Sequence, residues 1–421
     1  MKKIWFVVVS SLLLISISVQ GQERLKILSY NVLNYPNPDY NDQRADTLRK
    51  IIDHYTPDIF LIQELKSEAG LQELLDVAFN HSGEQFASAE WVSQVSNPGS
   101  TWPLQQNVIY NTEKLVLLND YFLLTAHRDI NIFRFLVKDE NLTSHMDSTI
   151  FYAVSWHLKS SQGAANAQQR ALMAQVLVDH FEVLDPEATV VVAGDYNIYT
   201  SNENAFSLLL NSSNAITLQD PIDAGGNWHD NAAFSYLHTQ STRTSQINGD
   251  GASGGMDDRF DLILGSENLF DPQHNMRYVD QSYEAFGNPG GNCLNQRLID
   301  CPNNDMPANI VYALYQMSDH LPVKMEIDVT LPTSLGIKNP SELLDLMGGN
   351  LVRDKLVLQL PTDFIGRTLS YNVFDIFGHQ VLDGQMSGSV LDIFTGALPA
   401  GMYILRLDAP QIASFRFVVV R

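Results

Sequence analysis

The stretch that decides the fold reads Val190-Val191-Val192-Ala193-Gly194-Asp195-Tyr196-Asn197. Its four apolar residues, three of them β-branched, are typical of a buried strand, and the polar side chains follow where that strand should end. In α/β proteins such strand ends commonly carry the chemistry. We therefore expect residues 190–197 to be a strand that leads into a functional site.

Further polar motifs with this layout lie in one order along the chain. Most follow an apolar run, such as residues 59–62 or 151–154. They read Ser29-Tyr30-Asn31-Val32-Leu33-Asn34, Gln63-Glu64-Leu65, Trp156-His157-Leu158-Lys159-Ser160, Arg259-Phe260-Asp261 and Ser318-Asp319-His320. Carboxylate and amide oxygens suit Mg²⁺ or Mn²⁺, and a His held by an Asp can move protons. The set therefore supplies the groups that metal-assisted cleavage of a phosphate ester needs.

From about residue 24 to residue 328 this ordered set resembles the endonuclease/exonuclease/phosphatase superfamily, which includes pancreatic-type deoxyribonuclease and abasic-site endonucleases. The motifs that carry the resemblance best are Gln63-Glu64, Gly194-Asp195-Tyr196-Asn197 and Ser318-Asp319-His320. The resemblance implies an α/β fold, a four-layer sandwich of two mixed β-sheets flanked by helices. Residues 157–160, with Asn166, Arg170 and residues 174–175, look most like the secreted bacterial nucleases of this superfamily.

The resemblance also implies a metal site. Glu64 would be the central ligand, Asn31 would orient the metal shell or the phosphate, and Asp319 would complete or water-bridge the site. The expected cofactor is Mg²⁺, with Mn²⁺ or Ca²⁺ as alternatives.

The catalytic roles are implied in the same way. Asp195 would position or activate the attacking water, and Asn197 would donate to a nonbridging phosphate oxygen. His320, held by Asp261, would contact the scissile phosphate and exchange a proton. His157 would stabilise the phosphate or protonate the leaving oxygen.

Further contacts with the substrate are less specific. Lys159 and Arg170 are expected to bind substrate, although a solvated strand-end Lys and a helix-surface ion pair explain them equally well. The superfamily also tends to place a Tyr and an Arg near the phosphate. Tyr110, Arg128 and Arg134 are the candidates here, and the sequence does not decide among them.

The N-terminal residues 1–21 have the layout of a secretory signal peptide. Two Lys precede an apolar core that is shorter than a membrane-spanning helix, and no later segment is apolar enough to cross a bilayer. The mature chain is therefore expected to be secreted or held on the cell surface, without a transmembrane segment. In an oxidising compartment, Cys293 and Cys301 are expected to form a local disulfide, with two free thiols as the alternative.

The net charge of −22 is not what a nucleic-acid binder is expected to carry. Residues 1–21 hold two Lys and no acid, and residues 334–421 hold seven basic and eight acidic residues. The acidity therefore belongs to the segment between them. One explanation is an acidic, well-solvated surface whose repulsion of polyanions is offset near the site by a metal ion and basic groups. The other is a substrate smaller than nucleic acid.

Four parts are expected along the chain: a signal peptide (1–21), a catalytic domain (22–330), a linker (331–341) and a C-terminal β-sandwich (342–421). In the catalytic domain, residues 46–54, 70–78 and 164–181 read as helices, and residues 108–110 and 114–118 read as a hairpin. The polar loops 239–258 and 281–307 are expected to border the active site. The C-terminal part has short alternating strands and resembles the sorting domain of type IX secretion cargo in Bacteroidetes, with an adhesion or carbohydrate-binding module as the alternative.

The expected function is a secreted, metal-dependent phosphodiesterase, first of all an extracellular deoxyribonuclease that is exported by the type IX machinery. A phospholipid or sphingomyelin phosphodiesterase and a small-molecule phosphatase of the same superfamily are the enzymatic alternatives. A surface adhesin on the same fold is the non-enzymatic one. The sequence leaves open the choice between DNA and RNA, the mode of cleavage and the oligomeric state.

Overall fold

The computed structural model of the protein describes residues 22–37, 43–83, 85–139, 148–291, 293–331, 345–346, 351–359, 368–375, 379–387, 390–408 and 413–419. The predicted signal peptide, and the predicted linker beyond Leu331, lie outside these residues. Within the described residues, no helix is both long enough and apolar enough to cross a membrane.

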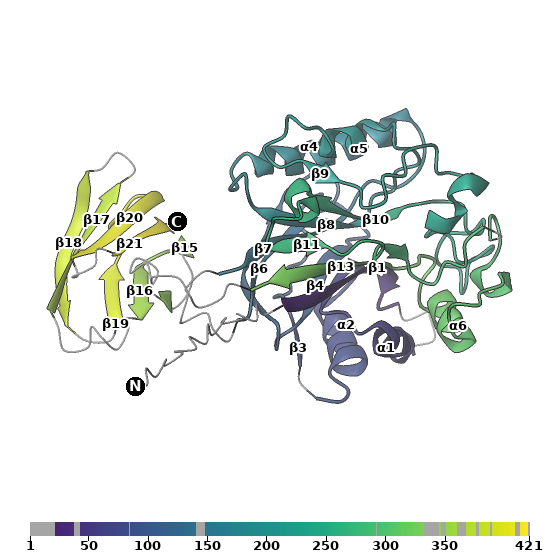
Figure 1. The fold of residues 1–421 in the computed structure, drawn as a ribbon, viewed down its shortest axis with the longest axis horizontal. Coiled ribbons are helices and arrows are strands. Elements are labelled where there is room, and N and C mark those ends of the chain that lie inside the picture. The colour runs from purple at the N-terminus through teal and green to yellow at the C-terminus, as the bar shows by residue number, and fades with distance from the viewer. Residues whose placement is uncertain are drawn as a thin grey trace, which may run out of the picture.

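Two large mixed sheets lie face to face (Figure 1). The first sheet has the order β11-β13-β1-β2-β4-β3, with β12 also paired to β13. Its strands are β1 (Gln22–Tyr35), β2 (Ile59–Leu65), β3 (Phe86–Ser88), β4 (Gln105–Asn111), β11 (Met276–Tyr278), β12 (Glu284–Ala285) and β13 (Val323–Thr330). The second sheet has the order β5-β6-β7-β8-β10-β9. Its strands are β5 (Leu115–Leu123), β6 (Ile130–Val137), β7 (Ile150–His157), β8 (Thr189–Asp195), β9 (Leu218–Gln219) and β10 (Asp261–Ser266).

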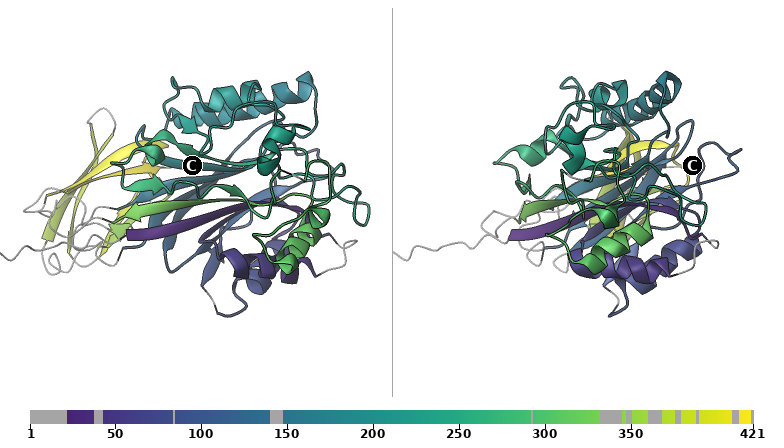
Figure 2. Two further views of the ribbon diagram at one scale, coloured as in Figure 1. Left: turned by 45° about the vertical axis from the view of Figure 1, so that its right-hand side comes forward. Right: turned by 90° about the vertical axis from the view of Figure 1, so that its right-hand side faces the viewer.

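Helices cover the outer face of each sheet (Figures 1 and 2). On the first sheet these are α1 (Arg44–Tyr55), α2 (Glu68–Glu73), the π-helical turn η1 (Leu74–Phe79) and α6 (Ala308–Met317). On the second sheet they are α4 (Ala164–Phe181) and α5 (Asn204–Leu209). Short 3₁₀ turns complete the set: η2 (Ala232–Leu237), η3 (Glu267–Phe270) and η4 (Leu298–Asp300). The predicted four-layer sandwich is confirmed.

Alternation along the strands explains why there are four layers. On β8, Val191 and Ala193 face the core between the two sheets, whereas Val190 and Val192 face the core beneath α4. A strand that is buried on both faces reads as a continuous apolar run, which is the pattern seen in the sequence. Helix α1 buries one stripe of side chains, including Leu48, and ends at Thr56, whose left-handed backbone caps it.

The predicted hairpin over residues 108–118 is wrong. Strand β4 pairs with β2 and β3 in the first sheet, whereas β5 pairs with β6 in the second sheet. The turn after Asn111 therefore carries the chain from one sheet to the other. Two strands with a polar turn between them have the same local pattern in both arrangements, so the sequence could not distinguish them.

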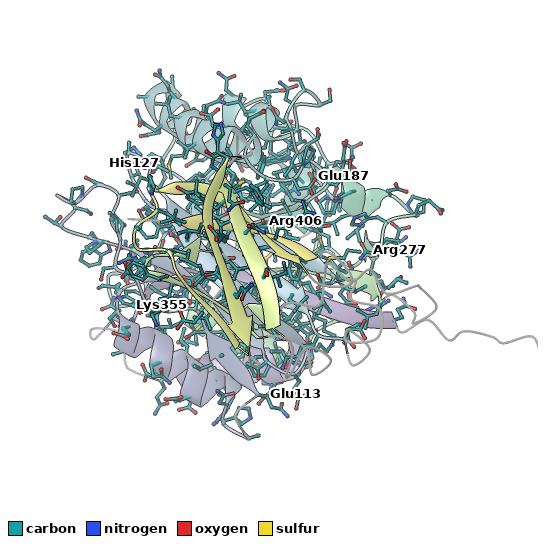
Figure 3. The ribbon with its side chains drawn as sticks, turned by 90° about the vertical axis from the view of Figure 1, so that its left-hand side faces the viewer. Glu113, His127, Glu187, Arg277, Lys355 and Arg406 are labelled. Atoms are coloured by element: carbon teal, nitrogen blue, oxygen red, sulfur yellow. A yellow bond between two sulfur atoms is a disulfide. The ribbon has the colours of Figure 1, made fainter. Side chains whose placement is uncertain are left out.

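The C-terminal strands form two small sheets, one of order β14-β16-β19 and one of order β15-β21-β20-β17-β18. They share a buried core that includes Leu356, Val373 and Phe417. The charged side chains of Lys355 and Arg406 are exposed (Figure 3). The strands are β14 (Asp345–Leu346), β15 (Leu351–Val352), β16 (Lys355–Gln359), β17 (Thr368–Asp375), β18 (Gln380–Ser387), β19 (Val390–Phe394), β20 (Gly401–Asp408) and β21 (Ala413–Val419). This confirms the predicted all-β character of the C-terminal part.

Candidate active site

Two parallel strand pairs, one in each large sheet, bring their carboxyl ends together. In the first sheet β1 lies beside β2, with Asn31 next to Gln63, so Glu64 follows at the adjacent strand end. In the second sheet β7 lies beside β8, with His157 next to Asp195. Asn31 joins the two sheets, because its Nδ2 donates to Glu64 Oε1 at 3.0 Å and to Asp195 Oδ2 at 3.1 Å.

Glu64 has an unusual backbone, with φ at 66° in the left-handed region. It lies where the pairing of β2 with β4 shifts register, between Ile62 and Leu65. The backbone N–H of Asn34 donates to its Oε2 at 2.9 Å. Burial, together with the negative charge of Asp319, raises the pKa of the Glu64 carboxyl. The Glu64 carboxylate is thus held in one orientation, and a bound cation would stabilise its negative charge.

His157 and Asp195 face each other, with 3.3 Å between Nε2 and Oδ2. Burial, and then the positive charge of Arg128, lowers the pKa of His157 well below its usual range, so its imidazole is neutral at pH 7. Asn197 donates to Asp195 Oδ1 through its backbone N at 3.0 Å and its Nδ2 at 2.7 Å. Burial raises the pKa of Asp195 to about 7, although the charge of His320 opposes the rise. A carboxyl of that pKa can accept a proton near neutrality.

His320 and Asp261 form the second proton-handling pair. Antiparallel pairing places Asp261 on β10 opposite Asp195 on β8, and its Oδ2 lies 2.7 Å from His320 Nδ1. Burial lowers the pKa of His320, but the charges of Asp261, Asp319 and Asp195 outweigh it and raise the pKa well above its usual value. We therefore assign an imidazolium whose Nδ1–H donates to Asp261.

The loop 239–258 borders the site, as the sequence predicts. Ala252 N donates to Asp319 Oδ2 at 2.6 Å. The side-chain amide of Gln240 lies 2.6 Å from His320 Nε2 and 3.3 Å from Asp319 Oδ2. The backbone N of His320 donates to Ser318 Oγ at 3.1 Å. Sequence reasoning assigned no role to Gln240 or Ser318, and the only signal for Gln240 was its place in this loop.

Arg128 is a partly buried cation of the site. Its guanidinium donates to the carbonyl of Leu158 at 3.1 Å. Burial lowers its pKa, and the charges of Glu64 and Asp195 oppose that shift. The pKa of Lys159 is lowered by burial and then by the charge of Arg128, so the two cations lie within electrostatic range of each other. Of the three candidates left open by the sequence, Arg128 therefore belongs to the site.

The other two candidates lie elsewhere. Tyr110 packs edge-on against Phe135 in the core between the sheets, with 5.2 Å between the ring centroids. Arg134 lies over the ring of Tyr152, 6.0 Å from its centroid.

The family model described as "Endonuclease/Exonuclease/phosphatase family" matches residues 28–274. The match covers more than half of the chain and includes Asn31, Glu64, His157, Asp195 and Asp261. The chain belongs to this family. Members of the endonuclease/exonuclease/phosphatase superfamily are hydrolases that act on phosphoester bonds. No curated protein matches the chain.

The chain is similar to several solved structures. An endonuclease/exonuclease/phosphatase from Bacteroides vulgatus is 15% identical, with a TM-score of 0.46 over 73% of this chain and 99% of that one. The human Nocturnin catalytic domain is 14% identical, with a TM-score of 0.44 over 74% and 98% of the two chains. D. rerio TDP2 complexed with a single-strand DNA product is 17% identical, with a TM-score of 0.43 over 72% and 98%.

The endonuclease/exonuclease/phosphatase site offers ligands for a divalent metal ion. Ligand atoms of Glu64, His157 and Asp195 lie within 4.8 Å of one another. Carboxylate oxygens are hard ligands, and burial raises the pKa of both Glu64 and Asp195, so a hard cation between them would stabilise their ionised forms. Asn31 turns its amide nitrogen to Glu64, while its Oδ1 accepts from Leu33 N at 3.0 Å. The place of Asn31 in a metal shell stays a prediction.

Arg170, for which the sequence offered substrate binding or an ion pair, has an ion-pair partner in the structure. Its side chain is only 1% exposed and pairs with Glu203 through Nε at 2.8 Å. The same guanidinium donates to the carbonyls of Lys159 and Ser161 at 2.8 and 3.0 Å. Arg170 therefore holds the loop that carries Lys159, and its bonds lie within the protein.

A disulfide joins Cys293 to Cys301, as predicted. The loop that it closes packs on the loop 239–258, where Leu298 N donates to the carbonyl of Thr242 at 3.0 Å. The disulfide thus supports the loop that borders the site.

Proposed function

We propose that the protein is a metal-dependent phosphodiesterase whose substrate is nucleic acid, with DNA as the first choice. One observation carries the proposal. The amide nitrogen of Asn31 lies 3.0 Å from Glu64 Oε1, 3.1 Å from Asp195 Oδ2 and 3.4 Å from His320 Nε2. The proposed metal ligand, base and acid therefore lie close together, as hydrolysis of a phosphate ester requires.

Glu64 would hold the metal ion, Mg²⁺ first of all, and His157, Asp195 and Asp319 are the neighbouring groups that can complete its coordination. When bound, the ion supplies Lewis-acid polarisation of the phosphate. The partly buried Arg128 adds fixed positive charge beside the same carboxylates. The metal ion and Arg128 would thus offset the negative charge of the chain where the phosphate would lie.

Different side chains would accept and donate the protons of the reaction. Asn197 donates twice to Asp195 Oδ1, whereas Oδ2 accepts from Asn31 and is the oxygen that would orient and deprotonate the attacking water. His320, kept as imidazolium by Asp261, donates through Nε2 to the phosphate oxygens as negative charge builds there. His157 is neutral, so it is suited to donating a hydrogen bond to the phosphate and is a poor source of a full proton.

We place the catalytic domain at residues 22–330. The first sheet, which begins at Gln22 and ends at Thr330, and the separate core of the C-terminal strands support this boundary. We further propose that residues 1–21 direct export, that residues 331–341 link the parts, and that residues 342–421 are a type IX sorting domain. The mature enzyme would then act outside the cell.

A second candidate substrate is a small phosphate ester or a phospholipid headgroup. The observation in its favour is the net charge of −22, which repels a polyanion over long range.

The test is hydrolysis by the full-length protein of plasmid DNA, sphingomyelin vesicles and bis(p-nitrophenyl) phosphate, each with Mg²⁺ and with chelator. Metal-dependent nicking of the plasmid is the expected result. Cleavage of only the lipid or the small diester would overturn the nuclease assignment while leaving the catalytic groups in place.

A further inference from the structure

An exposed tryptophan lies at the rim of the active site. Of the four Trp residues that the structure describes, only Trp102 is exposed, at 55%, while Trp156 and Trp228 are fully buried. An exposed indole is costly unless it has a use, because it keeps a large apolar surface in water.

Two hydrogen bonds connect Trp102 to Glu64, the proposed metal ligand. The indole Nε1–H donates to Asn34 Oδ1 at 2.8 Å, and the backbone N–H of Asn34 donates to Glu64 Oε2 at 2.9 Å. Asn34 is itself held by Asp250, whose Oδ1 accepts from its Nδ2 at 2.9 Å. The ring is thus pre-positioned, although its loop is otherwise exposed.

A lysine accompanies the ring. The ammonium of Lys66, two residues beyond Glu64, lies 4.2 Å from the centroid of the Trp102 ring. It holds the indole from one side, and the exposed remainder of the ring is open to a planar group. A cation beside an aromatic surface is the pairing that proteins use for single-stranded nucleic acid, where a base stacks and the adjoining phosphate meets positive charge.

We infer that Trp102 and Lys66 form a nucleotide-binding subsite, in which a nucleobase next to the scissile phosphate stacks on the indole. This inference rests on the proposed function and narrows it to substrates with an unpaired base at that position. A membrane is the less favoured occupant, because the exposed Asn97, Gly99 and Thr101 outnumber Val95, the exposed aliphatic side chain of this loop.

The experiment compares two substrates that share the same sugar-phosphate backbone. One is a single-stranded DNA trinucleotide, and the other is the same trimer without its bases. Full-length protein is assayed as wild type, Trp102→Ala, Trp102→Phe and Tyr312→Ala. Tyr312 is the control, because it is an aromatic residue exposed at 57% on α6.

Trp102→Ala is expected to raise KM for the normal trimer about tenfold and to leave the abasic trimer unchanged. Trp102→Phe keeps a stacking surface but loses the N–H to Asn34, so it should stay close to wild type. Lys66→Met should reduce the slope of log Kd against log salt by about 0.7, as expected for one lost phosphate contact with a single strand.

Three results would overturn the inference. Equal losses on both trimers, or equal losses in Trp102→Ala and Trp102→Phe, would mean that the ring only supports Asn34. Wild-type kinetics in Trp102→Ala would mean that the ring binds nothing. If the wild type cleaves neither trimer but hydrolyses sphingomyelin vesicles, the proposed function itself fails, and weaker vesicle binding by Trp102→Ala would then assign the ring to the membrane.

Discussion

Replacing Asp261 with Asn tests whether this carboxylate maintains the charge of His320. Asp261 Oδ2 lies 2.7 Å from His320 Nδ1, and the two side chains are only 1% and 3% exposed. Asn fills the same space and can still accept a hydrogen bond, so the variant removes the charge and keeps the packing. A hydrogen bond to a charged group contributes about 1.5–3 kcal/mol. We therefore expect kcat/KM to fall about 10- to 150-fold at neutral pH.

The same variant should shift the pH profile. The pKa of His320 is raised by Asp261, Asp319 and Asp195 against the effect of burial, so the imidazolium persists until pH rises through that raised value. Activity that needs the imidazolium is present below this pKa and is lost above it. Removing the Asp261 charge lowers the pKa, so the alkaline limb of the kcat/KM profile moves to lower pH.

The assay is the pH dependence of kcat/KM on bis(p-nitrophenyl) phosphate with Mg²⁺. Asp258→Asn is the matched control, because Asp258 is a nearby acid whose Oδ1 lies 2.7 Å from a different histidine atom, His229 Nδ1. Its effect should be much smaller than that of Asp261→Asn. An alkaline limb that does not move in Asp261→Asn, or one that moves as far in Asp258→Asn, would refute this assignment.

Three further predictions concern the surroundings of the site. Arg170→Met should lower the melting temperature, because it leaves Glu203 without its buried partner. It should also change KM by less than Lys159→Met does. A KM effect confined to Arg170→Met would instead indicate that Arg170 binds substrate. The double variant Cys293→Ser, Cys301→Ser should lower the free energy of unfolding by about 2–3 kcal/mol. The measurement is a urea titration, with the oxidised wild type as control. An unchanged free energy of unfolding would show that the disulfide does not stabilise the protein. Asn31→Ala should reduce kcat/KM about tenfold or more by removing the amide between Glu64 and Asp195, whereas Asn166→Ala on the surface of α4 should have no effect.

Much of the fold and of the site could be predicted because the informative residues are local. Asn31, Glu64, His157 and Asp195 each lie toward the carboxyl end of a largely apolar strand, and parallel pairing brings such strand ends together. Asp261 begins β10, which is antiparallel to β8, so it lies at the same edge of the sheet as the carboxyl end of β8. The position of Asp261 opposite Asp195 depends on strand register, which the sequence does not show.

The remaining contacts depend on partners that are distant in sequence. The sequence did not identify Glu203, 33 residues away, as the ion-pair partner of Arg170. Gln240 and Arg128 lie outside the regular strands, so no periodicity marks them. Trp102 shows its position only through Asn34, 68 residues earlier.

The most direct test of the central claim is the rate of bis(p-nitrophenyl) phosphate hydrolysis by full-length wild type, Glu64→Ala and His320→Ala, each with Mg²⁺ and with chelator. Tyr312→Ala is the folded control, and circular dichroism confirms that the variants are folded. The account predicts that chelator abolishes the wild-type rate and that each site variant loses on the order of 10²-fold or more. Full activity in chelator, in Glu64→Ala or in His320→Ala would contradict it.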